Sequence, residues 1–108
     1  MPLQDIPHAA SVRRMATEVT RNDAGLQYEI ELNGTPAGLI RFTRDDDVIT
    51  MVHTEVDPQF EGQGVGAELV QRALDDVRAR GERVIPLCPF VAAYIEKHPE
   101  YADLVSEG

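Results

Sequence analysis

Residues 56–70 read Val56-Asp57-Pro58-Gln59-Phe60-Glu61-Gly62-Gln63-Gly64-Val65-Gly66-Ala67-Glu68-Leu69-Val70, and they lead from an apolar strand pattern through a glycine-rich turn into a helical pattern. Glycine stands at every second position of the turn, so no side chain holds a ligand away from the backbone. Successive N–H groups in the first turn of a helix can therefore point at one anion, which predicts a phosphate-binding turn. The same spacing also occurs in tight strand-to-helix connections that bind nothing, so the rest of the chain has to decide between the two.

The pattern after the turn predicts a long helix between Gly64 and Gly81, because apolar residues recur there at helical spacing and glycine commonly ends a helix. Residues 83–87 then predict a short strand. Because a helix separates this strand from the one ending at Val56, we expect the two strands to be parallel neighbours, with the glycine turn at the carboxyl end of a sheet. The apolar stripe consists of Val65, Leu69, Val70, Ala73, Leu74 and Val77. Two i,i+4 charge pairs lie outside it: Glu68 with Arg72, and Asp76 with Arg80.

The N-terminal half predicts antiparallel strands. Residues 16–22 predict a first strand that ends at a turn over 22–25. Asn33-Gly34 is a strong hairpin signal, and the returning strand runs through residues 38–42. The strand between these turns has one buried face, because apolar and polar residues alternate along it. Its apolar members are Leu26, Tyr28, Ile30 and Leu32.

The acidic run at residues 45–47 lacks the spaced oxygen ligands of a calcium loop and predicts a solvated turn. Residues 48–56 are apolar or β-branched at most positions, which predicts a central strand covered on both faces, with His53 and Glu55 interrupting the pattern on one face. Pro89 at a first helical position predicts a second helix over about 90–98, and residues 100–104 add a further helical turn.

At 108 residues the chain predicts one domain, which we assign to residues 16–108, after an N-terminal arm of residues 1–15. The net charge of −9 argues against nucleic acid as a partner. No apolar run is long enough for a membrane span, and the first residues do not resemble a signal peptide, so we expect no membrane partner and a cytoplasmic location. Cys88 is the single cysteine and predicts a free thiol. The histidines His8, His53 and His98 show no metal-ligand spacing with it, so no metal is expected.

The predicted order of elements resembles the GNAT superfamily of acetyl-CoA-dependent N-acetyltransferases. It implies an α+β fold: a mixed, mostly antiparallel sheet with a strand-helix-strand glycine-turn unit and two C-terminal helices. The superfamily signature, Gln/Arg-x-x-Gly-x-Gly/Ala, is matched at Gly64 and Gly66, but this chain has Glu61 where the signature has Gln or Arg. Phosphate binding would then depend chiefly on backbone N–H groups.

Four separated motifs are similar to those of the small cysteine-containing GNAT family, the acetyltransferase CG family. They are His53-Thr54-Glu55-Val56, Gly62-x-Gly64-Val65, Pro86-x-Cys88-x-Phe90 and His98-Pro99-Glu100-Tyr101. The likeness covers most of the chain from about residue 17 onward. It implies binding of acetyl-CoA or CoA as donor co-substrate and allows an acetyl-cysteine intermediate, and it leaves the acceptor open.

Cys88 ends the last predicted strand directly before Pro89, which puts it at the start of a helix. Unpaired N–H groups and the helix dipole favour the thiolate there, and a thiolate can accept an acetyl group from a thioester. A lone cysteine can also be a small buried apolar residue. His53 and Glu55 lie on one face of their strand and are candidate bases, with the alternatives of a hydrogen-bonded sheet histidine and a partner for an arginine.

The resemblance implies that Ile95 occupies the position where many GNAT enzymes have a tyrosine that protonates the departing thiol, so the usual acid is missing. Tyr94 and Lys97 could contact the donor or could be a core residue and a solvated one. The residues expected to bind the donor are Val56, Glu61, Gly62, Gln63, Gly64, Val65, Gly66, Ala67, Pro89, Tyr94 and Lys97.

The sequence therefore predicts an acetyl-CoA-dependent N-acetyltransferase acting on an amine. Residues 22–25 leave room only for a turn where larger GNAT proteins have two helices, so we expect an open acceptor site that suits a protein lysine or a polyamine. The alternative is a CoA-binding or protein-interaction module without turnover, which Glu61 and Ile95 favour.

Overall fold

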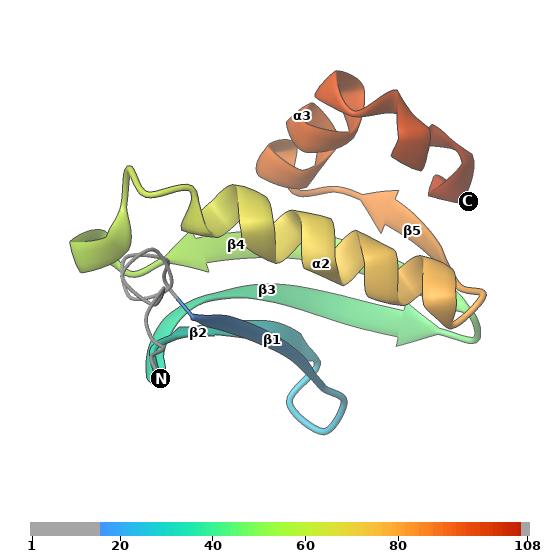
Figure 1. The fold of residues 1–108 in the computed structure, drawn as a ribbon. Helices are drawn as coiled ribbons and strands as arrows, with labels where there is room; N and C mark the ends of the chain where they lie inside the picture. Colours follow the sequence, from blue (N-terminus) through green and yellow to red (C-terminus); the bar gives the residue numbers. More distant parts are fainter. Residues whose placement is uncertain (1–15, 107–108) are drawn as a thin grey trace, which may run out of the picture.

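A computed structural model describes residues 16–106, and the predicted arm of residues 1–15 lies outside the described residues. Five strands form one sheet in the order β1-β2-β3-β4-β5 (Figure 1). The first four strands are antiparallel neighbours, and β5 runs parallel to β4. Their bounds are β1 Thr17–Asn22, β2 Gln27–Leu32, β3 Thr35–Asp45, β4 Val48–Val56 and β5 Arg83–Pro86. The predicted mixed sheet is confirmed.

The hairpin between β2 and β3 turns at Asn33 and Gly34, whose φ angles are 52° and 83°. Positive φ at both positions matches the right-handed twist of the strands, which is why this dipeptide signals a hairpin. Leu26, expected on the buried face of β2, is in fact 42% exposed with φ 56°, because it belongs to the preceding turn.

Helix α2 (Val65–Ala79) lies along one face of the sheet (Figure 1), and its predicted apolar stripe is buried in the core. Gly81, with φ 72°, follows the helix where a side chain would be strained. Both predicted charge pairs form: Arg72 to Glu68 at 3.0 Å and Arg80 to Asp76 at 2.7 Å.

The prediction that β4 is covered on both faces is wrong. Ile49 and Met51 are fully buried, whereas Val52, His53 and Glu55 are exposed. Among the described residues, helices cover only the face on which α2 lies, so the polar positions of β4 face outward (Figure 1). We call the uncovered side the open face.

A shift in the pairing of β3 with β4 occurs where Arg41 pairs with His53 but Phe42 pairs with Met51. Val52 is therefore an extra residue, a bulge that bends the strand. After it, Thr54 pairs with Ile40 and returns to the covered face.

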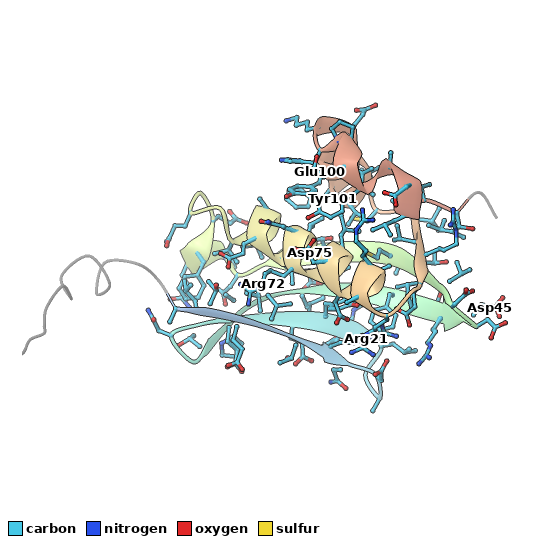
Figure 2. The ribbon with its side chains drawn as sticks, turned by 45° about the vertical axis from the view of Figure 1, so that its right-hand side comes forward. Arg21, Asp45, Arg72, Asp75, Glu100 and Tyr101 are labelled. Carbon is cyan, nitrogen blue, oxygen red and sulfur yellow. The ribbon has the colours of Figure 1, made fainter. Side chains whose placement is uncertain are left out.

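The chain ends its fold with helix α3 (Pro89–Lys97) and the 3-10 helix η2 (Pro99–Leu104). Tyr101 holds η2 against α2, because its hydroxyl donates to Asp75 Oδ1 at 2.7 Å, and Figure 2 shows the two side chains facing each other. Arg78 adds an ion pair to Asp103 at 3.0 Å. None of the described helices is long and apolar enough to cross a membrane.

Arg21 on β1 is buried beneath α2 and ties the edge of the sheet to the end of that helix (Figure 2). Its guanidinium contacts Glu82 at 2.6 Å, and the neighbouring Tyr28 hydroxyl donates to Asp76 at 2.7 Å. These charges satisfy one another, so we assign the cluster a structural role.

Candidate functional site

Strands β4 and β5 separate midway along β4. Their last ladder pair is Met51 with Pro86, followed by a hydrogen bond from the Cys88 N–H to the Met51 carbonyl at 2.9 Å. Beyond that bond the chain turns into α3, so residues 52–56 of β4 have a strand partner on the β3 side alone. We call this gap, bounded by residues 52–56 and 88–90, the strand opening.

The glycine turn lies at the carboxyl end of β4, after the short 3-10 helix η1 (Pro58–Phe60). Gly62 and Gly64 have φ angles of 85° and 80°, and a Cβ at either position would meet no atom within 4 Å. Both glycines are therefore required by the backbone conformation and leave open space in front of the turn.

Gly64 is the N-cap residue of α2 and offers no side chain to its N–H groups. The first hydrogen bond of the helix runs from the Glu68 N–H to the Gly64 carbonyl at 3.1 Å. The N–H groups of Val65, Gly66 and Ala67 precede it and have no carbonyl within the helix. This uncapped end fits an anion such as a phosphate.

Gly66 differs from the other two glycines. A Cβ there would lie 3.0 Å from Phe90 Cζ and 3.3 Å from Val56 Cγ2. The absence of a side chain at Gly66 therefore also makes room for the ring of Phe90, whereas Gly62 and Gly64 face open space. Glu61 and Gln63 are exposed in the turn.

Cys88 is buried, with 5% of its surface exposed, and it is the N-cap residue of α3, as the sequence predicted. Its Sγ lies 3.3 Å from Thr54 Oγ1. Burial by itself raises the pKa of the thiol, but the Thr54 hydroxyl and the backbone N–H groups of Val91 and Phe90 outweigh it, and the pKa is lowered. The sulfur makes no full capping hydrogen bond, so part of this stabilisation is electrostatic.

The sequence patterns do not predict Thr54 as a neighbour of the thiol. The signal was its place within the His53-Thr54-Glu55-Val56 motif, two residues before Val56 and hence on the same face of β4.

His53 and Glu55 lie on the open face, with His53 Nε2 3.0 Å from Glu55 Oε2 and more than half of each side chain exposed. Neighbouring strand residues point to opposite faces, so these two point away from Thr54 and the thiol beside it. The structure thus brings the two candidate bases together, on the other side of β4 from Cys88.

The open face carries a hollow of about 490 Å³ beside Glu55. Its lining residues include four carboxylates and neither lysine nor arginine. The sequence patterns do not predict a site at this hollow. The alternation of Glu29 and Glu31 along β2 was the available signal. The hollow is lined by Gln27, Glu29, Ile30, Glu31, Pro36, Ala37, Gly38, Leu39, Glu55, Val56, Asp57 and Pro58.

Comparison with protein families decides what this chain is related to. The profile of GCN5-related N-acetyl-transferases matches residues 27–104. This range includes the strand opening and the glycine turn, from β4 through η1, α2 and β5 to α3. The chain belongs to this family. No curated protein sequence is similar enough to this GCN5-related protein to count as a relative.

Two solved structures share the fold of this family member. A GCN5-like protein from Staphylococcus aureus, solved by NMR, is 24% identical with a TM-score of 0.62, over 82% of this chain and 87% of that one. The ribosomal-protein-S18-alanine N-acetyltransferase from Escherichia coli is 23% identical with a TM-score of 0.56, over 68% of this chain. This chain spans only 50% of the length of the E. coli enzyme.

In helix α3 of this GCN5-related chain, the ring of Tyr94 stacks on the ring of His98, with 4.0 Å between the ring centroids. The centroid of the Tyr101 ring lies 6.2 Å from that of Tyr94. These contacts are those of a residue packed against the core. Ile95 is buried and Lys97 is exposed. Pro89 is the first residue of α3, beside the strand opening.

Across residues 16–106, no group of three or more histidine, cysteine or acidic side chains could hold a metal ion. His8 lies outside the described residues.

Proposed function

We propose that this protein transfers an acetyl group from acetyl-CoA to an amine, with Cys88 as the residue that carries the group. The observation behind the proposal is a thiol with lowered pKa at the base of the strand opening, on the same side of β4 as an uncapped helix end. Family membership supports the reaction class.

The donor would bind along the covered side of the strand opening. The turn from Glu61 to Gly64 and the N–H groups of residues 65–67 would hold the pyrophosphate, and the pantetheine arm would run past Val56 and Pro89 toward Cys88. Open space in front of Gly62 and Gly64 supports the first part of this path. Tyr94 and Lys97 stay predicted donor contacts at the other end of α3.

The chemistry assigned to Cys88 needs no external reductant or metal. The thiolate attacks the thioester carbonyl carbon, a new C–S bond forms, and the C–S bond to CoA breaks as CoA leaves as a thiolate. One thioester replaces another, so the step is nearly balanced and demands no strong acid. An amine then attacks the acetyl-Cys88 carbonyl, the C–N bond forms, and the Cys88 thiolate departs.

The amine must lose a proton to become a nucleophile and another after it attacks. His53 and Glu55 would accept these protons from the open face, where they already share a 3.0 Å contact. In this arrangement the donor reaches β4 from the covered side and the acceptor from the open side. His53 and Glu55 then need no contact with the thiol, because the protons they accept come from the amine.

A cationic acceptor, such as a polyamine or a protein lysine, is supported by the charge of the hollow. Glu29, Glu31, Glu55 and Asp57 line it. Such a site attracts ammonium groups and discriminates against anionic acceptors.

Rapid-quench mass spectrometry with acetyl-CoA tests the proposal. We expect acetylation on Cys88 within the first turnover, and loss of transfer to spermidine or to a lysine peptide in Cys88→Ala. Cys88→Ser is the matched control, because it keeps the size of the side chain but lacks a thiolate. An unacetylated Cys88 together with full transfer by Cys88→Ala would overturn the covalent route and leave direct transfer.

The alternative, a binding module without turnover, is favoured by the exposed Glu61 in the turn and the buried Ile95 in the usual position of the acid. Calorimetry separates the two. Saturable acetyl-CoA binding without release of CoA over a broad panel of amines would establish the module, and absence of binding would overturn both.

A further inference from the structure

Phe90 is a large aromatic residue in the first turn of α3, and 46% of its surface is exposed. The end of its ring nevertheless packs tightly: a Cβ added to Gly66 would lie 3.0 Å from Cζ and 3.3 Å from Cε2. Val56 lies at the same spot, with Cγ2 3.3 Å from that Cβ position. The ring therefore joins α3 to the first turn of α2, next to the end of β4.

The place of this contact follows from the alternation along β4. Thr54 and Val56 are two residues apart and share the covered face. Cys88 lies against Thr54, and Phe90 lies beside Val56 and Gly66. The ring thus packs at the glycine-turn end of the strand opening, and Cys88 lies two residues before it in the chain.

We propose that Phe90 is the residue that admits the acyl donor: its ring closes the strand opening between the glycine turn and Cys88 and turns outward when a pantetheine arm enters. The inference rests on the proposed function, because it concerns the path of the donor that the proposed function requires.

The movement is physically inexpensive. Nearly half of the surface of Phe90 is already exposed, so rotation about its staggered side-chain torsions uncovers limited additional apolar area. A pantetheine arm would replace the ring against Val56 and Gly66, and the displaced ring can pack along the arm. In the closed position the ring also shields the path to the Cys88 thiol, which lies beside the Thr54 hydroxyl.

The test compares wild type with Phe90→Ala and Phe90→Leu, and uses Leu87→Ala as the matched control. Leu87 is also apolar, lies in the same segment and is 65% exposed. The first readout needs no ligand: the rate at which the bulky disulfide reagent DTNB labels Cys88, relative to the rate with small iodoacetamide. We expect the relative DTNB rate to rise at least about fivefold in Phe90→Ala and less in Phe90→Leu, and to stay unchanged in Leu87→Ala.

The second readout is the association rate of dethio-CoA, a probe that lacks the reactive sulfur, measured by stopped-flow. It should rise in Phe90→Ala and not in Leu87→Ala. Circular dichroism checks that each variant is folded, and Phe90→Leu serves if Phe90→Ala is not. Unchanged labelling and unchanged association, with dethio-CoA bound by wild type, would overturn the role of Phe90 alone. Failure of every protein to bind dethio-CoA, even with faster labelling, would overturn the proposed function and with it this inference.

Discussion

Within residues 16–106, the thiol of Cys88 has one side-chain hydrogen-bond partner, the hydroxyl of Thr54 at 3.3 Å. A hydroxyl can turn its hydrogen toward a thiolate, and a hydrogen bond to a charged group contributes about 1.5–3 kcal/mol. This contact is one of the causes that hold the pKa of Cys88 below its ordinary value. Thr54 is therefore expected to determine how much of the thiol is reactive at neutral pH.

Replacing Thr54 by valine keeps the shape of the side chain and removes its hydroxyl. The pKa of Cys88 should rise, and alkylation by iodoacetamide at pH 7 should slow by about tenfold, since about 1.4 kcal/mol corresponds to a factor of ten. The pH dependence of the alkylation rate measures this change. Thr43→Val, at an exposed position of β3, is the control. An unshifted pH profile in Thr54→Val would assign the low pKa to the helix end instead.

The sequence could predict the helix-end position of Cys88, because Pro89 marks the first residue of a helix. It could not predict the contact with Thr54. A threonine in a strand is compatible with either face, and the bulge at Val52 decides which face Thr54 takes. The sequence likewise contains Phe90 only as part of a motif. Its packing on Gly66 could not be predicted, because the two residues belong to different helices.

Helix α2 begins without the side-chain cap that most helices use. Gly64 occupies the N-cap position with φ 80°, and no atom lies within 4 Å of a Cβ built on it. An added methyl group would therefore cost backbone strain alone, without a clash. The left-handed conformation costs an ordinary L-residue about 1–2 kcal/mol.

Gly64→Ala should lower the free energy of unfolding by about 1–2 kcal/mol. Gly64→Asn should cost less, because asparagine adopts the left-handed conformation more readily. Urea denaturation followed by circular dichroism measures both. Equal losses in the two variants would contradict backbone strain as the cause.

The predicted elements agree with the structure where local chemistry specifies them. The Asn33-Gly34 turn, the apolar stripe of α2 and its end at Gly81 each depend on residues close in sequence. The prediction for β4 failed because burial of a strand depends on what lies over its far side. Val52 is apolar and exposed for that reason, and within residues 48–56 only the polar His53 and Glu55 on one face signalled an open side.

At the scale of the whole molecule, one sheet separates two environments. The covered face holds the core, the thiol and the uncapped end of α2, and the open face holds the acidic hollow and the pair of His53 and Glu55. The hollow combines residues of three strands with the segment after β4, so only the strand order brings its carboxylates together. The net negative charge could be predicted from the sequence, but the grouping of carboxylates on one face of the sheet could not.

The covered side also makes the molecule sensitive to alkaline pH. Burial, and then a hydrogen bond donated to a carboxylate, raises the pKa of Tyr28 beside Asp76 and of Tyr101 beside Asp75. A tyrosine whose pKa is raised by folding contributes full stability below the pKa of the unfolded chain, about 10, and loses it as the pH rises above that value. Each of these tyrosines should therefore reduce the free energy of unfolding by about 1.4 kcal/mol per pH unit above about pH 10.

Urea denaturation at pH 8 and at about pH 11 measures this loss. Tyr101→Phe should be less stable than wild type at pH 8, because Asp75 loses its partner, and should decline less steeply with pH because one titrating group is gone. Both effects arise where η2 docks on α2, so they test whether that contact holds the C-terminal segment in place. If the free energies of unfolding of wild type and Tyr101→Phe declined in parallel above pH 10, the Tyr101 hydroxyl would not be buried against Asp75 in solution.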